Sequence, residues 1–164
     1  MSATPPQPAR AVVLTISDSR TSGERQDLSG PAVAASLQAA GFIVEGPHLV
    51  PDEQPQIEAM LRSHAANATL VVTTGGTGIA PRDVTPEATR DILDREILGI
   101  AEAIRGSGLS AGITDAGLSR GLAGVSGSTL VVNLAGSRYA VRDGMATLNP
   151  LAAYIIGRLS SLEI

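Results

Sequence analysis

The segment Gly75-Gly76-Thr77-Gly78 carries the strongest chemical signal in the sequence. Glycines adopt positive φ angles and let a ligand approach closely, and successive backbone N–H groups in such a loop form an anion-binding nest. The pattern differs from a dinucleotide-binding loop in its glycine spacing, and from a P-loop because the chain contains no lysine. An ordinary glycine-rich turn between a strand and a helix is the competing interpretation.

Asp83 and Asp52 are the acidic residues whose positions could matter to such a loop. A carboxylate beside a phosphate repels it, unless a divalent cation such as Mg²⁺ bridges the two groups. We therefore consider both residues as metal ligands, or as carboxylates that orient a metal-bound water or accept a proton. Two structural alternatives stay open: Asp83 could cap the turn before residue 85, and Asp52 could be a helix N-cap.

Serine hydroxyls supply further candidates. Residues 17–20 read Ser-Asp-Ser-Arg, and Ser119 and Ser128 lie in a later glycine-rich region. Hydroxyls and arginine suit oxyanions, but the same residues are common in solvated loops. His64 falls on the apolar face of a predicted helix, so we expect it to be packed in the core rather than to act as a catalyst or ligand. Two G-x-S-x-G segments occur, at residues 108–112 and 117–121, but neither directly follows a predicted strand as a nucleophile elbow requires, which disfavours a serine hydrolase.

The composition excludes several other functions. The chain has 164 residues, no cysteine and a formal net charge of −4. The missing cysteine excludes thiolate catalysis, iron–sulfur ligation and disulfides, and the missing lysine excludes a Schiff base. The acidic balance and the low aromatic content, 2% of residues, argue against nucleic-acid binding. No apolar run approaches the roughly 20 residues of a membrane span, and residues 1–10 lack a signal-peptide core, so we expect a cytoplasmic protein with no membrane partner.

Alternating strand and helix patterns must position these residues. Short apolar runs predict strands over residues 11–16, 42–45, 69–74 and 128–134. Helical spacing predicts helices over residues 32–40, 57–65 and 97–105, a helix that starts with Thr85 as its N-cap, and a C-terminal helix over residues 141–159 that Asn149-Pro150 caps and restarts midway. Residues 106–127 are glycine-rich and stay unassigned.

This order of elements predicts an α/β fold, a single-domain three-layer sandwich with a mostly parallel sheet and helices on both faces. We expect residues 1–10 to be a disordered tail and residues 11–164 to form the domain. Ligands bind beyond the carboxyl ends of the strands in such sheets, so the loops after residues 16, 50, 74 and 134 are expected to form the site. The apolar stripe of the C-terminal helix packs either on the sheet or on a neighbouring subunit.

Residues 73–78 (Thr-Thr-Gly-Gly-Thr-Gly) and 81–89 (Pro-Arg-Asp-Val-Thr-Pro-Glu-Ala-Thr) closely resemble the signature of a known family. It is the molybdopterin-binding MogA/MoaB family of molybdenum cofactor biosynthesis, which is related to the G domain of gephyrin. Weaker agreements follow in the same order over nearly the whole chain, among them Asp27-Leu28-Ser29-Gly30, Leu118-Ser119-Arg120 and residues 132–137, Val-Asn-Leu-Ala-Gly-Ser.

The resemblance implies a nucleotidyltransferase, molybdopterin adenylyltransferase, that joins molybdopterin to the adenylyl group of Mg-ATP and releases pyrophosphate. It also implies a homotrimer, contacts with other proteins of the pathway, and Mg²⁺ as the cofactor. Asp52 and Asp83 match the family's catalytic acids and are assigned to the metal. The positions that match the substrate pocket are Ser17, Asp18, Gly75, Gly76, Thr77, Gly78, Ser119, Ser128, Gly136 and Ser137.

Several positions depart from the family pattern. Ala135 stands where we expect the proline of an Asn-Leu-Pro-Gly motif, and Leu98 and Ile100 stand where proline and phenylalanine are usual. The segment at residues 27–30 resembles the MoaB side of the family, in which some members lack the transferase activity. The alternative function is therefore a catalytically silent, MoaB-like molybdopterin-binding or assembly module. A scaffold whose loops are only turns is a third interpretation.

Overall fold

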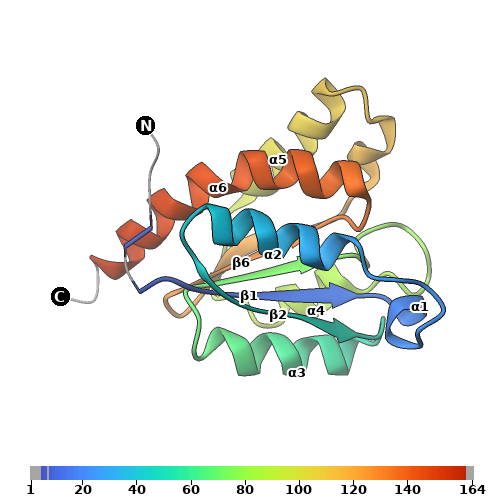
Figure 1. Ribbon diagram of the computed structural model, residues 1–164, viewed down its shortest axis with the longest axis horizontal. Helices are drawn as coiled ribbons and strands as arrows, with labels where there is room; N and C mark the ends of the chain where they lie inside the picture. The colour runs from blue at the N-terminus through green and yellow to red at the C-terminus, as the bar shows by residue number, and fades with distance from the viewer. Residues whose placement is uncertain (1–4, 7, 162–164) are drawn as a thin grey trace.

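One sheet lies between two layers of helices in the computed structural model, which describes residues 5, 6 and 8–161 (Figure 1). Six strands in this part of the chain follow the order β2-β1-β3-β6-β5-β4. Their bounds are β1 Arg10–Ile16, β2 Ile43–Val50, β3 Leu70–Thr74, β4 Arg95–Glu96, β5 Ala123–Ser126 and β6 Thr129–Leu134. Strands β2, β1, β3 and β6 pair in parallel, whereas β5 pairs antiparallel with both β6 and β4. The predicted α/β sandwich with a mostly parallel sheet is confirmed.

Helices cover both faces of this sheet (Figure 1). The helices on one face are α2 (Ser29–Ala39), α5 (Leu98–Ser110) and α6 (Arg138–Ser160), and those on the other are α3 (Gln54–Ala65) and α4 (Thr85–Arg90). A short helix α1 (Asp18–Thr21) follows β1, and a 3₁₀ helix η1 (Thr114–Leu118) follows α5. The end of α5, η1 and β5 lie within residues 106–127, for which the sequence predicts no element.

Alternation along β1 explains why both faces need cover. Ala11 and Val13 belong to the core on the side of α2 and α6, and Val12 and Leu14 belong to the core on the side of α3 and α4. All four side chains are buried. Successive strand side chains point to opposite faces, so a strand buried on both faces has a continuous apolar sequence. Residues 11–16 have that pattern.

Helix α6 is continuous, so the predicted interruption at Asn149-Pro150 is wrong. Pro150 and Ala146 are both exposed, and water can bind the Ala146 carbonyl that an N–H at residue 150 would otherwise have bonded. A proline inside a helix costs about 3 kcal/mol, whereas each large apolar side chain that is fully buried contributes roughly 1.5–3 kcal/mol. Helix α6 buries four of them against the core, namely Val141, Met145, Leu148 and Ile156. Packing of this stripe on the sheet therefore outweighs the local effect of the proline.

The ordered domain begins earlier than residue 11. Strand β1 starts at Arg10, and Ala9 is buried in the core and accepts a hydrogen bond from the Ile43 backbone N–H at 2.9 Å. Both residues belong to the stretch predicted as a tail, so its boundary is corrected by at least these positions. Residues 1–4 and 7 of that tail lie outside the described residues. Within the described part of the chain, no helix is long and apolar enough to span a bilayer.

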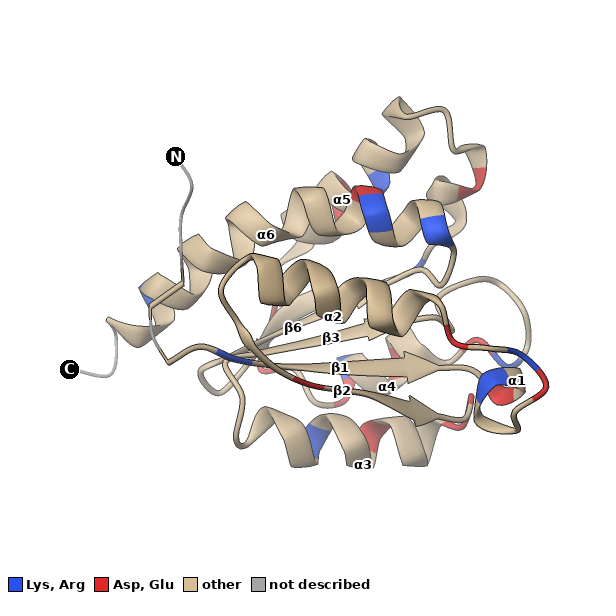
Figure 2. Ribbon diagram, in the orientation of Figure 1, with Lys and Arg blue, Asp and Glu red and all other residues tan. Residues whose placement is uncertain are grey.

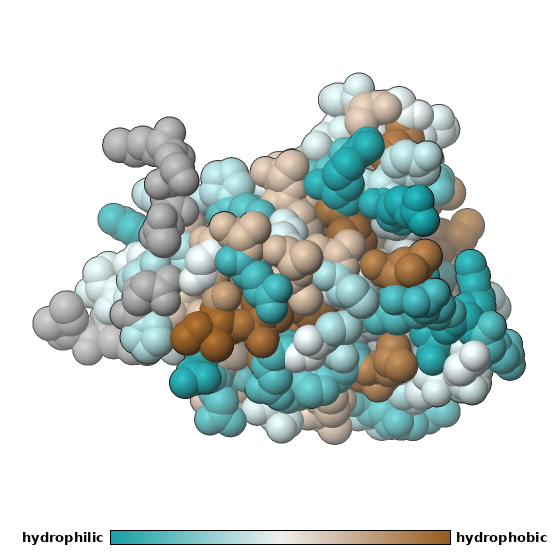
Figure 3. Space-filling view, in the orientation of Figure 1, coloured by the Kyte–Doolittle hydropathy of each residue, from teal (hydrophilic) through white to brown (hydrophobic). Residues whose placement is uncertain are grey.

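Strand β2 forms one edge of the sheet and is longer than predicted, since it continues from residue 45 to Val50. Two of its apolar side chains, Ile43 and Leu49, are exposed. Figure 3 shows apolar surface gathered over the start of this strand. Part of edge strand β2 is therefore in contact with solvent. The loop that follows it lies at the carboxyl end of the sheet.

Candidate functional site

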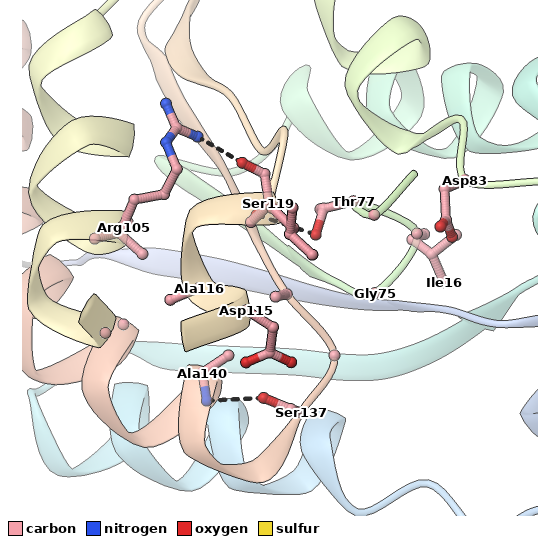
Figure 4. Close-up of a pocket in the computed structure, with 18 of the residues that line it drawn as sticks. Ile16, Gly75, Thr77, Asp83, Arg105, Asp115, Ala116, Ser119, Ser137 and Ala140 are labelled. Carbon is pink, nitrogen blue, oxygen red and sulfur yellow. Dashed lines mark hydrogen bonds between the residues drawn. The ribbon is translucent and has the colours of Figure 1, made fainter. Parts of the chain in front are cut away.

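A cavity of about 460 Å³ opens at the carboxyl ends of β1, β3 and β6. This is the sheet edge at which ligands bind in open α/β folds. The glycine loop after β3 forms one wall, and α5, η1 and the start of α6 form the other (Figure 4). The loop after β2 contributes Asp52. The predicted loop ends thus meet at one site.

The glycine loop is held from both sides by the elements that follow it. Gly75 and Gly76 have φ angles of 101° and 67°, in the region that favours glycine. The Gly75 N–H donates to the Leu134 carbonyl of β6 at 2.9 Å, and the Thr85 hydroxyl donates to the Gly75 carbonyl at 3.0 Å. Thr85 is therefore the first residue of α4 rather than its N-cap, which is Val84, and that prediction is wrong. Its hydroxyl fixes the loop instead.

Arg120 holds the far end of the same loop. Its backbone N–H donates to the Thr77 carbonyl at 2.8 Å, its Nε donates to the Gly78 carbonyl at 2.8 Å, and its Nη2 donates to the Asp83 carbonyl at 2.7 Å. Nη1 forms an ion pair with Glu87, and the hydrogen bond from Arg120 lowers the pKa of the Glu87 carboxyl. The Arg120 guanidinium thus joins the chain after η1 to both ends of residues 78–87, the segment that contains the predicted metal ligand Asp83.

Asp52 lies at the floor of the site and is bonded to the loop after β1. The Asp18 backbone N–H donates to Asp52 Oδ2 at 2.9 Å, and the Asp52 N–H donates to Asp18 Oδ1 at 3.0 Å. Arg82 forms an ion pair with the Asp18 carboxylate. The N-cap position of α3 is Glu53, so the helix-capping alternative for Asp52 is wrong.

The two carboxyl groups of this pair differ in their pKa values. Hydrogen bonding from Arg82 lowers the pKa of Asp18. Burial raises the pKa of Asp52, and the negative charges of Asp18 and Asp83 act in the same direction, against the lowering effect of the Asp18 N–H. A nearby positive charge would therefore stabilise the ionised form of Asp52 more than that of Asp18.

Asp83 has a structural role and still offers a free oxygen to the cavity. Its Oδ2 accepts a hydrogen bond from the Ala80 N–H at 3.0 Å, so the turn-capping alternative holds for that atom. A methyl group on Gly78 would lie 2.8 Å from Asp83 Oδ2, which shows how closely the carboxylate folds over the glycine loop. Among the described residues, neither Asp83 Oδ1 nor Asp52 Oδ1 accepts a hydrogen bond.

These observations fit a bound Mg²⁺. Magnesium prefers carboxylate oxygens and keeps several waters, so two acids with one free oxygen each are a suitable donor set. The raised pKa of Asp52 has Asp83 among its causes, so the two charges are close enough to interact. Asp52 and Asp83 are the residues that would hold the ion.

Two arginines face the same cavity, Arg20 from α1 and Arg105 from α5. Arg105 Nη1 donates to the carbonyls of Ser119 and Gly121 at 3.1 and 3.0 Å, which ties α5 to the chain after η1 (Figure 4). Arg20 Nε is buried and has no hydrogen-bond partner within the described residues. An oxyanion bound in the cavity would satisfy this donor, which is costly to leave unpaired. Figure 2 shows ribbon segments of charged residues gathered at this end of the sheet, around α1.

Acidic side chains lie on the opposite wall. Asp115 of η1 and Asp143 of α6 both line the cavity, and Asp143 Oδ2 is buried without a hydrogen-bond partner in the described chain. Carboxylates at this wall can accept hydrogen bonds from the N–H groups of a heterocycle. The cavity therefore offers phosphate-binding groups at one end and N–H-binding groups at the other.

The structure brings most of the predicted site residues together. Ten of them line the cavity, namely Ser17, Asp52, Gly75, Gly76, Thr77, Gly78, Asp83, Ser119, Gly136 and Ser137. Asp18 is bonded to Asp52 beside it. Ser128 is not brought to the site, because it lies in the turn between β5 and β6, at the opposite end of the sheet. We therefore leave Ser128 out of the candidate site. Sequence reasoning missed Arg105, Asp115 and Asp143.

A comparison with known families matches residues 12–153 to the family described as "Probable molybdopterin binding domain". The chain belongs to this family. The matched range contains every residue of the cavity described above, so the glycine loop, both arginines and the acids on each wall are all parts of the molybdopterin-binding domain.

Similar proteins share this domain over much of the chain. A molybdopterin biosynthesis protein from Mycobacterium abscessus has 58% sequence identity and a TM-score of 0.90, covering 95% of this chain and 99% of that one. The molybdenum cofactor synthesis protein cinnamon of Drosophila melanogaster is 40% identical over 88% of this chain, which spans only 25% of that relative. The molybdopterin adenylyltransferase of Haemophilus influenzae is 38% identical over 80% of this chain and 68% of its own length.

Proposed function

We propose that the protein acts in molybdenum cofactor biosynthesis and transfers the adenylyl group of Mg-ATP to molybdopterin. The observation that carries the proposal is the cavity at the carboxyl ends of the strands, where the glycine loop, Arg20 and Arg105 meet the acids Asp52 and Asp83. The Haemophilus relative named molybdopterin adenylyltransferase supports it. The expected cytoplasmic location stays a prediction.

The reaction suits a chain without cysteine or lysine. The terminal phosphate of molybdopterin is already an anion, so it can attack the α-phosphorus of ATP without a protein nucleophile or general base. A new P–O bond forms between that phosphate oxygen and the α-phosphorus, the bond from the α-phosphorus to the bridging oxygen breaks, and pyrophosphate leaves. Positioning and charge stabilisation supply the catalysis in such phosphoryl transfers.

The residues divide this work by their chemistry. Backbone N–H groups of the loop at residues 75–78 bind phosphate oxygens, and Arg20 and Arg105 balance negative charge that develops on them. Asp115 and Asp143 bind N–H groups of the heterocycles. Asp52 and Asp83 would hold a magnesium ion, which would supply positive charge to the triphosphate. Because none of the described residues that line the cavity is aromatic, the adenine ring lies against aliphatic side chains and backbone.

The second candidate function is a molybdopterin-binding or assembly module without transfer activity. The segment at residues 27–30, which resembles the MoaB side of the family, favours it. In the structure Asp27 accepts hydrogen bonds from the Thr15 hydroxyl at 2.8 Å and from the Gly30 N–H at 3.0 Å. This segment braces the start of α2 against β1, and none of its residues lines the cavity, so the transferase remains our first proposal.

A product assay separates the two functions. The protein is mixed with Mg²⁺, ATP and purified molybdopterin, and pyrophosphate release is followed. We expect Asp83→Asn to lower the rate by about 100-fold or more. The asparagine Oδ1 can still accept the Ala80 N–H, so the turn is preserved. Glu58→Gln, a change at a half-buried residue of α3 that does not line the cavity, serves as the control and should keep full activity.

Two outcomes would decide against the transferase. Tight molybdopterin binding without any ATP-dependent product would establish the binding module instead. Undiminished turnover in Asp83→Asn would remove the role given to that residue. Calorimetry that shows no heat with either ligand would favour a scaffold whose loops are only turns.

The homotrimer and contacts with other pathway proteins belong to this proposal as well. Since the apolar stripe of α6 is used within the chain, it is not the surface that joins subunits. Exposed apolar side chains on edge strand β2, Ile43 and Leu49, are available for that contact. Light scattering at micromolar concentration should give the mass of three chains, and a monomeric mass would contradict the trimer.

A further inference from the structure

A second cluster of metal-ligating side chains lies outside the cavity. Glu45, His48 and His64 each offer one ligand atom, and these atoms lie within 4.8 Å of one another. His48 Nε2 is 2.9 Å from Glu45 Oε1, and His64 Nδ1 is 3.8 Å from the same oxygen. We propose that these three residues bind a first-row divalent transition-metal ion, with Zn²⁺ as its representative.

The register of β2 brings two of the ligands to one face. Val12 and Leu14 of β1 pair with Glu45 and His48, so β2 uses one residue more than β1 over this stretch. Residues three apart in a regular strand point to opposite faces, but the extra residue of a bulge restores the same face. Val12 and Leu14 belong to the core on the side of α3. Glu45 and His48 therefore point toward α3 from the edge of the sheet.

The third ligand comes from the last turn of α3. His64 follows Ile57 and Leu61 at spacings of seven and three residues, so it shares their buried face. The sequence placed it in the core, but its side chain keeps 18% of its surface exposed and its ring stacks on that of His48, with centroids 5.0 Å apart. It lies at the border of the core, where solvent reaches the cluster.

The donor set selects a class of metal. Two imidazoles and one carboxylate suit Zn²⁺ and its neighbours in the first transition row, whereas Mg²⁺ prefers oxygen ligands alone. In a tetrahedral zinc site, ligand atoms lie about 3.3 Å apart. The 2.9 and 3.8 Å distances from Glu45 Oε1 bracket this value, and all three side chains are at least partly exposed, so small rotations can close the set around an ion. Water would complete the coordination.

The site is separate from the proposed Mg²⁺ site. Asp52 precedes the first turn of α3, whereas His64 is in its last turn, about 15 Å farther along the helix axis. The groove beside the cluster, about 260 Å³ in volume, is lined by the first halves of β1 and β2, including Arg10. A metal here would fasten the end of α3 to edge strand β2 and would not touch the substrates of the proposed reaction.

The composition of the chain leaves few competing ligands for zinc. His48 and His64 are its two histidines, and it has no cysteine, so an untagged protein has no other strong nitrogen or sulfur ligands for zinc. Calorimetric titration of the full chain with Zn²⁺ at pH 7.5 should give one site. His48→Gln and His64→Gln should each weaken it by more than about tenfold, since loss of even a ligand's hydrogen-bond partner costs that much. Glu58→Gln, which alters a carboxylate on the same helix, should bind as the wild type does.

A second measurement needs no variant. The imidazole proton signals of the two histidines are followed by NMR while Co²⁺ is added below stoichiometric amounts, and both should broaden together. Asp83→Asn should leave this broadening unchanged, which separates the cluster from the cavity. Circular dichroism checks that each variant is folded. Broadening of one histidine alone, no broadening at equal Co²⁺ and protein, or unchanged Zn²⁺ affinity in His48→Gln would overturn the proposal.

Discussion

Asp18 and Asp52 exchange hydrogen bonds, each backbone N–H donating to the other's carboxylate, at 2.9 and 3.0 Å. The exchange locks the loop after β1 to the loop after β2. It also uses Oδ2 of Asp52 and leaves its Oδ1 beside Gly76, where a methyl group would lie only 3.0 Å away. The neighbouring Asp18, rather than a basic residue, thus sets the position of the free oxygen of Asp52. A bound cation would relieve the repulsion between these two carboxylates.

Replacing Asp52 with asparagine should stabilise the protein while removing activity. Burial raises the pKa of Asp52, so at neutral pH the folded state carries a charge that it disfavours. Between the unfolded value of 3.8 and the raised pKa, the folded state binds more protons, so the wild type loses stability as pH rises through this window. We expect Asp52→Asn to melt at a higher temperature than the wild type at pH 7.5, and this advantage to disappear near pH 3.5. Pyrophosphate release should fall by about 100-fold or more.

The control for this prediction is the cation itself. Millimolar Mg²⁺ should raise the melting temperature of the wild type and should raise that of Asp52→Asn much less. A variant that melts below the wild type at pH 7.5 would contradict the conclusion that the folded state disfavours the charge of Asp52.

A methyl group at Gly76 should disturb the site more than the fold. At its φ of 67° a residue with a Cβ costs about 1–2 kcal/mol. The added methyl would also collide with Thr85 Oγ1 and press on Asp52 Oδ1. We expect Gly76→Ala to lower the free energy of unfolding by at least that amount and to reduce Mg²⁺-dependent turnover further than the stability loss explains.

Gly106 provides a matched comparison. It lies on α5 with no atom near its Cβ position, so Gly106→Ala should stabilise the helix by roughly 0.5–1 kcal/mol. Chemical unfolding of both variants, with turnover measured on the same samples, checks the pair. Equal activities in the two variants would show that the close contact between residue 76 and Asp52 does not matter for turnover.

Arg120 should act on the rate through the position of the loop. Its three side-chain contacts, to Gly78, Asp83 and Glu87, come from three different nitrogens of the guanidinium, whereas lysine has a single nitrogen that cannot occupy all three positions. We expect Arg120→Lys and Arg120→Ala both to raise the KM for ATP and lower kcat, by about tenfold or more in kcat/KM. Steady-state kinetics at saturating molybdopterin measures the split. A lysine variant with wild-type constants would show that the contacts to the loop are dispensable.

Asn133 should be important for stability rather than for chemistry. It is buried in β6, its Nδ2 donates to the hydroxyls of Thr73 and Thr89 at 2.9 Å, and its Oδ1 accepts the Leu122 N–H at 3.0 Å. Replacing it with alanine leaves the Leu122 N–H without this buried acceptor, so Asn133→Ala should cost about 2–4 kcal/mol of unfolding free energy. Urea denaturation measures it. A loss below 1 kcal/mol, about that of a typical surface change, would mean that water replaces the network.

The acids of the site could be predicted because they lie in the loops that follow successive strands. In a parallel sheet, the ends of β1, β2 and β3 meet at one edge, so local sequence after each strand was enough to bring Asp18, Asp52 and Asp83 together. Their individual roles were harder to predict from the sequence. A residue that caps a turn or helix and a residue that binds a ligand differ only in the hydrogen bonds that they form. Thr85 shows this, because a good N-cap residue uses its hydroxyl on the glycine loop instead.

The opposite wall could not be predicted from local patterns. Arg105, Asp115 and Asp143 come from α5, η1 and α6, and their approach to the glycine loop depends on how those elements pack on the sheet. Ser128 was assigned to the pocket from the family resemblance. The predicted strand over residues 128–134 places Ser128 at its start, and because β6 runs parallel to β3, that start lies at the end of the sheet away from the cavity.

The cavity is lined by residues as far apart in the chain as Ile16 and Gly144. A ligand that fills the cavity therefore binds only the folded domain, because a fragment from either half of the chain lacks part of the binding site. Each tenfold excess of ligand over its Kd adds about 1.4 kcal/mol to the stability of the entire domain. Resistance to proteases at sites distant from the cavity should then report substrate binding, even in a variant that performs no reaction.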